Sequence, residues 1–267
     1  NEMLDEVTIV EDGYSRLPRK DMVGAFTTVK ADDIMMPAYQ SIDQMLQGKI
    51  AGMSVVNTSA RVGASPKITI RGTSTILGNT SPLWVVDGVI QEDPLSIDIS
   101  AALTSDMKEL IGNQISWLNP QDIDNITVLK DASATAIYGS RAANGVVILT
   151  SKKGKKGQKA KVNVSAQYGV SQMTGDKVQM MNAEQWLGFQ EMLDPSMKNN
   201  ASFQDWKNFC IDNGISTNWA DIFFGGTAPT KQLDVNVTGG NDILNYYLSV
   251  GHYDAEGIMD DSNMRRE

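Results

Sequence analysis

Residues 119–157 read NPQDIDNITVLKDASATAIYGSRAANGVVILTSKKGKKG, and this stretch decides the fold of the chain. Asn119 and Pro120 predict the start of a short helix, because asparagine caps helix N-termini and proline suits the first helical position. The β-branched run at 126–129 predicts a strand. The run at 146–149 is apolar at every position, so it predicts a strand that is buried on both faces and central in its sheet.

The segment between these two strands is rich in alanine and ends in turn-forming residues. Residues 132–138 predict a helix, and Gly139 suits a left-handed end to that helix. Asn144-Gly145 predicts a tight turn into the next strand. Strand, helix and strand joined by short turns predict an α+β unit, and this pattern alone is equally typical of a small domain with no special role.

The preceding part of the chain continues the same pattern. Residues 41–52 predict a helix, in which Ser41 and Gln44 form a capping box. Residues 53–56 and 68–71 predict strands, since both are short β-branched runs followed by turn residues.

Further turns complete the predicted unit, which extends from Ser41 to Leu149. The turn-rich residues 57–66 predict a loop, and Asp87-Gly88 predicts a hairpin between strands at 83–86 and 89–90. Alternating strand and helix signals with short turns predict one compact unit with a small mixed sheet. We expect its core to contain Ile42, Leu46, Val55, Ile68, Ile70, Val85, Val128, Val147 and Leu149.

After Gly157 the pattern changes to a period of two residues. Three segments alternate apolar with polar residues, which predicts strands with one apolar face. These segments are 161–172, 231–239 and 243–254. Between the first two, residues 183–193 predict a helix capped by Asn182, and the rest predicts loops; residues 260–267 predict no strand. A transmembrane β-barrel has this pattern, but a soluble antiparallel sheet shows the same alternation.

Composition argues against several functions. The chain has 267 residues and a formal net charge of −9, which argues against nucleic acid and anionic membrane surfaces as partners. Its one cysteine, Cys210, excludes an internal disulfide, and its one histidine, His252, is far from it in sequence. No catalytic, nucleotide-binding or zinc motif occurs, so we expect no catalytic residue, metal or cofactor. No apolar run is long enough to predict a membrane helix.

Two blocks of the sequence resemble the plug domain of SusC-like (SusC/RagA) TonB-dependent outer-membrane transporters. The first contains LQGKIAGM at 46–53, ITIRG at 68–72 and PLWVVDGV at 82–89; the second is LKDASATAIYGSRAANGVVILTSKKG at 129–154. The resemblance implies an α+β plug domain, with a small mixed sheet and short helices, followed by the first antiparallel strands of a transmembrane β-barrel.

The resemblance also implies a division of the chain. Residues 1–20 would be a TonB-box-like segment and linker, residues 21–157 the plug domain, and residues 158–267 the start of the barrel with a long extracellular loop. Because so few strands cannot close a barrel around a plug, we expect an N-terminal fragment of a longer transporter.

Functional residues follow from the resemblance. The TonB-coupling segment would be Asp5, Glu6, Val7, Thr8, Ile9 and Val10, in which Thr8 departs from the family's pattern. The plug motif would comprise Arg71, Gly72, Asp87, Gly88, Lys130, Asp131, Tyr138, Gly139, Arg141, Asn144 and Gly145. The family favours a partly buried Arg71 that pairs with barrel carboxylates, whereas the sequence alone leaves a solvated position open.

The implied function is the gate of an energised importer of glycans or other nutrients in the bacterial outer membrane, with its N-terminus in the periplasm. Its partners would be TonB, a SusD-like surface lipoprotein, a glycan or peptide substrate and outer-membrane lipid. Loops 57–66 and 92–113 are expected to face substrate, because binding residues concentrate on loops. The candidates are Asn57, Ser59, Arg61 and Ser65. The alternatives are a soluble α+β binding or adhesion module and, less favoured, an enzyme.

Overall fold

The computed structural model describes residues 9–11, 16–18, 25–36, 41–57, 59, 62–72, 80–92, 114–131, 135–174, 180–258 and 262–267. The chain divides into two compact units. The first holds residues 1–169, 230–255 and 263–267, and the second holds residues 170–229 and 256–262.

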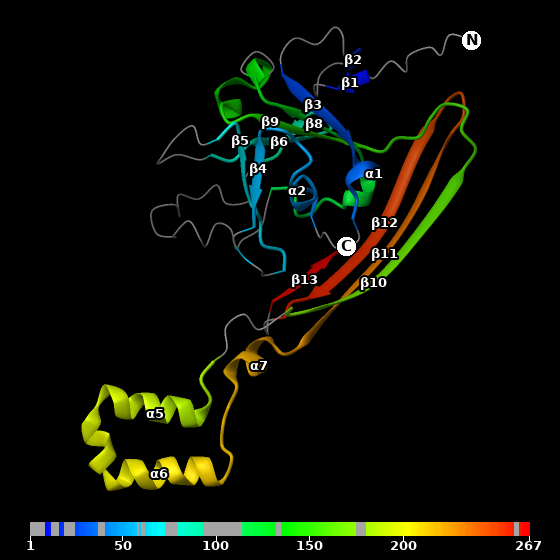
Figure 1. The fold of residues 1–267 in the computed structure, drawn as a ribbon. Helices are drawn as coiled ribbons and strands as arrows, with labels where there is room; N and C mark the ends of the chain where they lie inside the picture. The colour runs from blue at the N-terminus through cyan, green and yellow to red at the C-terminus, as the bar shows by residue number, and fades with distance from the viewer. Residues whose placement is uncertain are drawn as a thin grey trace, which may run out of the picture. The chain divides into compact units, whose positions relative to one another are not determined.

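The first unit is built on a five-stranded mixed sheet with the order β3-β8-β9-β6-β7 (Figure 1). Its strands are β3 (Phe26–Lys30), β6 (Leu83–Val86), β7 (Val89–Ile90), β8 (Ile123–Leu129) and β9 (Val146–Ser151). The central strand β9 runs antiparallel to β8 and parallel to β6. The prediction of a buried central strand at 146–149 is therefore confirmed.

Alternate side chains of β9 enter two hydrophobic clusters, one on each face of the sheet. Val147 and Leu149 join the larger cluster, to which α1 (Ala31–Ile34) and α2 (Ile42–Met45) also contribute. Val146 and Ile148 join the smaller cluster, with Tyr138 and Ala142. Apolar side chains thus cover both faces, and the expected α+β core is confirmed. Its predicted members are all buried: Ile42, Leu46, Val55, Ile68, Ile70, Val85, Val128, Val147 and Leu149.

Two separate strand pairs accompany the sheet, and a hairpin forms one of its edges. β4 (Met53–Val56) and β5 (Lys67–Ile70) form an antiparallel pair whose apolar residues enter the larger cluster. The predicted hairpin between β6 and β7 is present, and its turn residues Asp87 and Gly88 have φ values of 47° and 86°. Positive φ at both central residues is the requirement of a type I′ turn. β1 (Ile9–Glu11) and β2 (Arg16–Pro18) form an isolated two-stranded pair.

The helix predicted at 41–52 was wrong in its length and its cap. Only Ile42–Met45 is helical, because Gly48 and Gly52 adopt φ values of 71° and 79° that a right-handed helix cannot contain. The oxygen that accepts from the backbone N–H of Gln44 is Oδ1 of Asp43, at 3.0 Å. The hydroxyl oxygen of Ser41 is buried and makes no hydrogen bond.

Of the helix predicted at 132–138, residues 132–134 lie outside the described residues, and the rest is helical up to Gly139. It includes the first part of the 3-10 element η4 (Ala136–Ala142), which is interrupted at Gly139. Gly139 lies at a kink with φ 68° and ψ −156°, which is not the left-handed helical cap that was expected. The predicted cap at Asn119 is confirmed: its Oδ1 accepts from the N–H of Gln121 at 3.1 Å and begins η3 (Pro120–Asp122).

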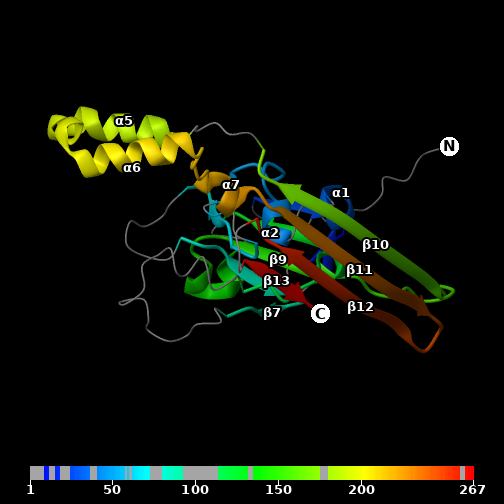
Figure 2. The same cartoon turned by 90° about the horizontal axis from the view of Figure 1, so that it is seen from below.

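A four-stranded sheet with the order β10-β11-β12-β13 completes the strands (Figure 2). Its members are β10 (Lys161–Gln172), β11 (Thr227–Gly240), β12 (Asn245–Glu256) and β13 (Asn263–Arg266). The first three agree with the predicted strands, and β11 and β12 are antiparallel. Strand β13 was missed, because its sequence, NMRR, lacks β-branched residues and covers only four positions.

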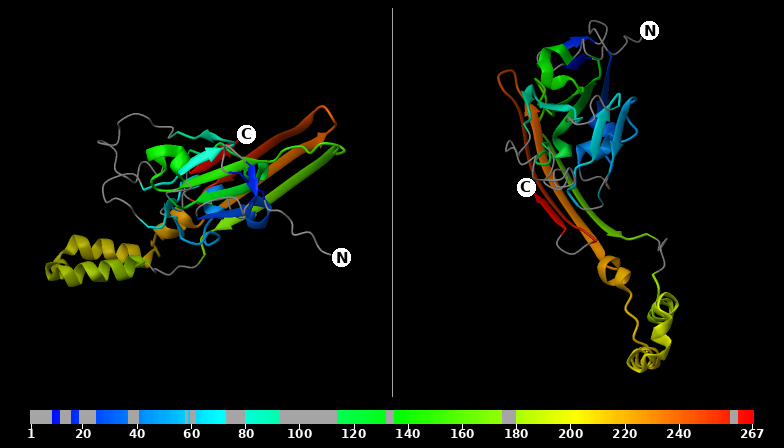
Figure 3. Two further views of the ribbon diagram at one scale, coloured as in Figure 1. Left: turned by 90° about the horizontal axis from the view of Figure 1, so that it is seen from above. Right: turned by 90° about the vertical axis from the view of Figure 1, so that its left-hand side faces the viewer.

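The second unit contains helices where mostly loops were predicted (Figure 3). α5 (Ala183–Leu193) has the expected bounds and a complete capping box between Asn182 and Gln185. The structure adds η5 (Pro195–Asn199), α6 (Ala201–Asp212) and α7 (Trp219–Phe224). Glu191 of α5 accepts from Gln204 at 2.6 Å and pairs with Lys207 at 2.9 Å. These bonds, that of Gln204 foremost, lower the pKa of Glu191.

In the part of the chain that the structure describes, the helices are too short and too polar to span a lipid bilayer.

We predict that Gly145→Ala destabilises the protein more than Gly157→Ala. Both glycines have positive φ, 93° and 71°, so alanine is strained at either position by about 1–2 kcal/mol. Only at Gly145 would the added Cβ also meet neighbours, Cδ1 of Ile70 at 2.8 Å and the carbonyl oxygen of Leu129 at 3.1 Å. Overpacking adds about 1–3 kcal/mol. Denaturant unfolding of the purified protein measures the difference, and equal losses would contradict the account of this turn.

Candidate functional site

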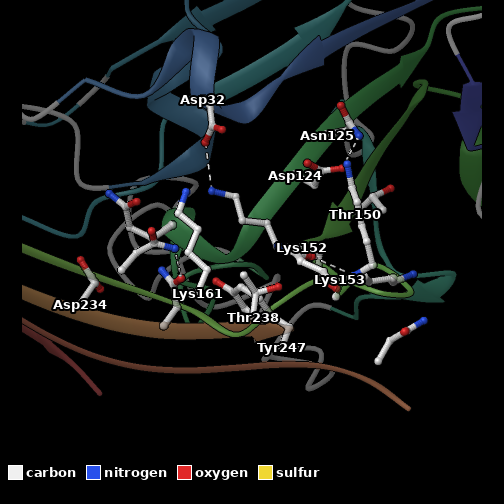
Figure 4. Close-up of a pocket in the computed structure, with 18 of the residues that line it drawn as sticks. Asp32, Asp124, Asn125, Thr150, Lys152, Lys153, Lys161, Asp234, Thr238 and Tyr247 are labelled. Carbon is white, nitrogen blue, oxygen red and sulfur yellow. Dashed lines mark hydrogen bonds and ion pairs between the residues drawn. The ribbon is translucent and has the colours of Figure 1, made fainter. Parts of the chain in front are cut away.

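A polar cavity of about 1220 Å³ lies in the first unit between the five-stranded sheet and β10–β12 (Figure 4). The five-stranded mixed sheet contributes Thr127 and Thr150. Strands β10–β12, called the strand wall below, contribute Asn163, Asn236 and Thr238 from their polar side. The lining also contains lysine and aspartate side chains: Asp32, Asp124, Lys152, Lys153, Lys155, Lys161 and Asp234. Amides, hydroxyls and charges dominate this surface, in contrast to the apolar clusters of the mixed sheet.

The opposite face of the strand wall is apolar and exposed. Leu248 and Val250 of β12 are 68% and 77% exposed, and they alternate with Tyr247, which lines the cavity. Val162 and Tyr168 of β10 are exposed as well. The period-two pattern therefore separates a polar side, which faces the mixed sheet, from an apolar side.

Two hydrogen bonds join the turn at 119–122 to the strand wall. Nδ2 of Asn119 donates to Oδ1 of Asp234 in β11 at 2.7 Å. The hydroxyl of Tyr247 in β12 donates to Oδ1 of Asp122 at 2.8 Å. Asp234 is buried, and its second oxygen accepts from Nε2 of Gln232 at 2.6 Å. Asn119 and Asp122 thus stand at the two ends of η3, and their partners Asp234 and Tyr247 lie on the polar side of the strand wall.

The exit from β9 makes further contacts around the cavity. Nζ of Lys152 pairs with Oδ1 of Asp32 in α1 at 3.0 Å, and its backbone N–H donates to the carbonyl of Asp122 at 2.7 Å. Beyond it, a Cβ at Gly154 would collide with backbone atoms of Gly239 and Tyr246. Only glycine lets the chain pass this close to the strand wall.

The structure brings several predicted motif residues together at the end of β5. Arg71 has φ 58° and pairs with Asp131 at 3.5 Å. The neighbouring Lys130 donates from Nζ to the carbonyl of Ala51 at 2.7 Å, and burial followed by the charge of Arg71 lowers the pKa of Lys130. The side chain of Arg71 is 51% exposed, and its expected pairing with barrel carboxylates stays a prediction.

A second group of motif residues supports the I′ turn. Asp87 accepts from the backbone N–H of Ser151 at 3.1 Å and from its hydroxyl at 2.6 Å. Lys153 lies 3.7 Å from the same carboxylate. These bonds fix Asp87 in its positive-φ conformation and tie the turn to the end of β9.

The remaining motif residues lie apart from these groups. Tyr138 is buried in the smaller cluster, and Arg141 pairs with Glu92 at 3.7 Å. Nδ2 of Asn144 donates to the carbonyl of Ser81 at 3.4 Å. Gly72, Gly88, Gly139 and Gly145 all have positive φ, which explains the glycines in the motif.

The loop candidates are only partly accessible. Asn57 and Ser59 are exposed, whereas the hydroxyl oxygen of Ser65 is buried without a hydrogen bond. Arg61 and residues 93–113 lie outside the described residues.

The N-terminal candidates are described in part. Asp5, Glu6, Val7 and Thr8 lie outside the described residues. Ile9 and Val10 belong to β1, where they stand opposite Pro18 and Leu17 of β2.

Among the described residues, the His, Cys, Asp and Glu side chains form no group of three that could hold a metal ion. His252 lies 3.7 Å from Glu267, and Cys210 is buried in the second unit.

Sequence reasoning missed Asp122, whose carboxylate accepts from Tyr247, and the cavity residues Asp32, Asp234 and Tyr247. The signal was present for the last two, because both occupy polar positions in alternating strands. Nothing in the sequence indicated that these positions would face the turn at 119–122.

Comparison with known proteins identifies relatives along the whole chain. Residues 18–146 match the family model of the TonB-dependent receptor plug domain. The chain is 35% identical over 267 residues to the TonB-dependent receptor SusC of Bacteroides thetaiotaomicron, covering 99% of this chain and 24% of SusC. It is 32% identical over 268 residues to the TonB-dependent receptor P26 of Formosa agariphila, covering 98% of this chain and 24% of that receptor. The chain thus spans about a quarter of the length of these relatives.

Solved structures give the same result. The RagAB peptide importer in its open-open state matches with a TM-score of 0.73 at 29% identity, over 97% of this chain and 29% of that chain. A second structure of the RagAB peptide transporter matches with a TM-score of 0.72 at 30% identity, over 91% of this chain and 28% of that chain.

Proposed function

Residues 18–146 belong to the TonB-dependent receptor plug domain family, and from this premise we propose that the chain supplies the plug and first wall strands of a SusC-like outer-membrane nutrient importer. The five-stranded sheet, with the helices and the β4–β5 pair packed against it, would be the plug. Strands β10–β13 would begin the barrel. The observation that carries this proposal is the two-sided strand wall, with polar side chains toward the plug and apolar side chains on the other face.

The exposed apolar face favours a lipid environment for the wall strands. Leu248 and Val250 would leave more than half of their surface in water if the sheet were soluble. Burial of apolar surface is worth about 25 cal/mol per Å², and large exposed apolar patches mark membrane or protein contacts. A soluble α+β binding or adhesion module has no such use for this face, and nothing in the comparisons favours it.

The proposed role is gating rather than covalent chemistry. The plug would close the barrel, and its movement would admit a glycan or peptide captured together with a SusD-like surface lipoprotein. In support, the relatives are TonB-dependent receptors, and one solved relative is a peptide importer. The exposed residues Asn57 and Ser59 would face the substrate side, and the Lys152–Gly157 exit would face the periplasm.

Energy would enter through the N-terminal segment. A short β-prone segment can extend the edge of a partner's sheet through backbone hydrogen bonds, with little demand on sequence. The pairing of β1 with β2 is weak, because the two strands form an isolated ribbon. In addition, Pro18, which stands opposite Ile9, has no N–H to donate. We propose that TonB replaces β2 as the partner of Ile9 and Val10.

We predict that the Val7→Pro/Ile9→Pro double variant of the complete receptor reaches the outer membrane and binds substrate but does not import it. Proline removes the N–H groups on which strand pairing with TonB depends. The Val7→Thr/Ile9→Val variant is the matched control, because it keeps β-branched residues and every N–H, and it should import normally. Uptake is measured at equal surface abundance. Wild-type uptake by the double proline variant would exclude this segment as the coupling strand.

We also predict that Ser59 is reached from outside the cell and Lys156 is not. Single cysteine variants Ser59→Cys and Lys156→Cys, made in a Cys210→Ala background, are treated on intact cells with a membrane-impermeant maleimide. Both positions are exposed in the structure, so the side of the membrane decides the outcome. The Ser59→Cys variant should react at once and the Lys156→Cys variant only after lysis. The opposite result would invert the proposed orientation.

A further inference from the structure

The contact between the turn at 119–122 and the strand wall differs in kind from the rest of the plug. The mixed sheet is held by buried apolar side chains, whereas this contact consists of hydrogen bonds from Asn119 to Asp234 and from Tyr247 to Asp122, beside a polar cavity. Water can replace each of these bonds when the surfaces separate, so the contact can open without exposing the core.

Asn119 occupies the centre of this contact because both ends of its side-chain amide are used. Oδ1 accepts from the N–H of Gln121 at 3.1 Å and caps η3, while Nδ2 donates to Asp234 at 2.7 Å. An aspartate at position 119 would retain the cap, since Asp and Asn cap helices about equally well. It would present an oxygen to Asp234 and replace a hydrogen bond by repulsion between carboxylates.

Gly251 makes room for the same bond. It stands opposite Asp234 in the pairing of β11 with β12. A Cβ added to Gly251 would lie 2.6 Å from Nδ2 of Asn119 and 2.7 Å from Oδ1 of Asp234. A methyl group there would force the donor and the acceptor apart while leaving both residues in place.

Resting on the proposed function, we propose that Asn119, Asp122, Asp234 and Tyr247 form a seating latch, which fixes the plug against β11 and β12 at rest and opens when the plug moves. Asn119 and Asp234 are positioning residues in this device. Gly251 supplies the space that the latch requires.

Exchanging the hydrogen-bond donor and acceptor between positions 119 and 234 tests the latch. In the complete purified receptor, Asn119→Asp should increase hydrogen exchange of the backbone amides of residues 119 and 121–125 about tenfold, the effect of losing one hydrogen bond to a charged group. Adding Asp234→Asn should restore wild-type exchange. The amide introduced at position 234 can donate from its nitrogen to the carboxylate introduced at position 119, while its oxygen still accepts from Gln232. If the single variant exchanges like wild type, or the double variant fails to recover, the latch is refuted.

A steric wedge tests the same pair independently. Gly251→Ala should loosen the turn as Asn119→Asp does. Gly169→Ala in β10 is the matched control, because its Cβ would meet only Cβ of Thr230 at an ordinary 3.9 Å. Equal exchange in the two alanine variants would contradict the space that Gly251 is proposed to provide.

Cells report whether the latch opens during transport. Without TonB, Asn119→Asp and Gly251→Ala should admit a large antibiotic that the wild-type outer membrane excludes, whereas Asn119→Asp/Asp234→Asn should not. With TonB, nutrient uptake should persist in all of them. Loss of uptake without leakage would make the contact a static support and overturn the proposal. If wild type shows no TonB-dependent uptake, the proposed function fails, and hydrogen exchange in the purified protein still decides the latch.

Discussion

Strand β9 is paired on both edges and covered by apolar side chains on both faces, and the rest of the first unit depends on that double constraint. The sheet is mixed because β6 pairs with β9 in parallel and β8 pairs with it antiparallel. The positive-φ residues Asp87 and Gly145 stand where neighbouring turns meet β9. Its last residues then lead into the contacts of Ser151 and Lys152 with Asp87 and Asp32.

The unit joins two kinds of interface with different costs of opening. A buried leucine or valine in the sheet contributes about 1.5–3 kcal/mol that water cannot replace. A hydrogen bond between the turn at 119–122 and the strand wall contributes about 0.5–1.5 kcal/mol, or up to about 3 kcal/mol with a charged partner such as Asp234. A pulling force therefore breaks these hydrogen bonds well before it disrupts the hydrophobic core. The plug can be rigid within itself and still be releasable from the wall.

Much of this arrangement could be predicted from the sequence, because the relevant signals are local. The apolar run at 146–149 indicated a central strand, Asp87-Gly88 a hairpin, and Asn182 with Gln185 the start of α5. The features that could not be predicted depend on single glycines, on polar helices, or on contacts between residues far apart in the sequence. Gly48 ended a helix whose apolar periodicity continued, and α6 has too many polar residues to stand out from a loop. Asn119 was predicted as a cap, but its second bond, to Asp234, joins residues 115 positions apart and has no sequence signature.

We propose that the strand wall has its apolar face in lipid and its polar face against the plug. Nitroxide labels placed singly at positions 247–250 of β12, in the complete receptor reconstituted in liposomes, test it most directly. Collision with oxygen dissolved in the membrane should be frequent at Leu248 and Val250 and rare at Tyr247 and Ser249. Uniform access along the strand, or lipid access at Tyr247 and Ser249 instead, would contradict the account.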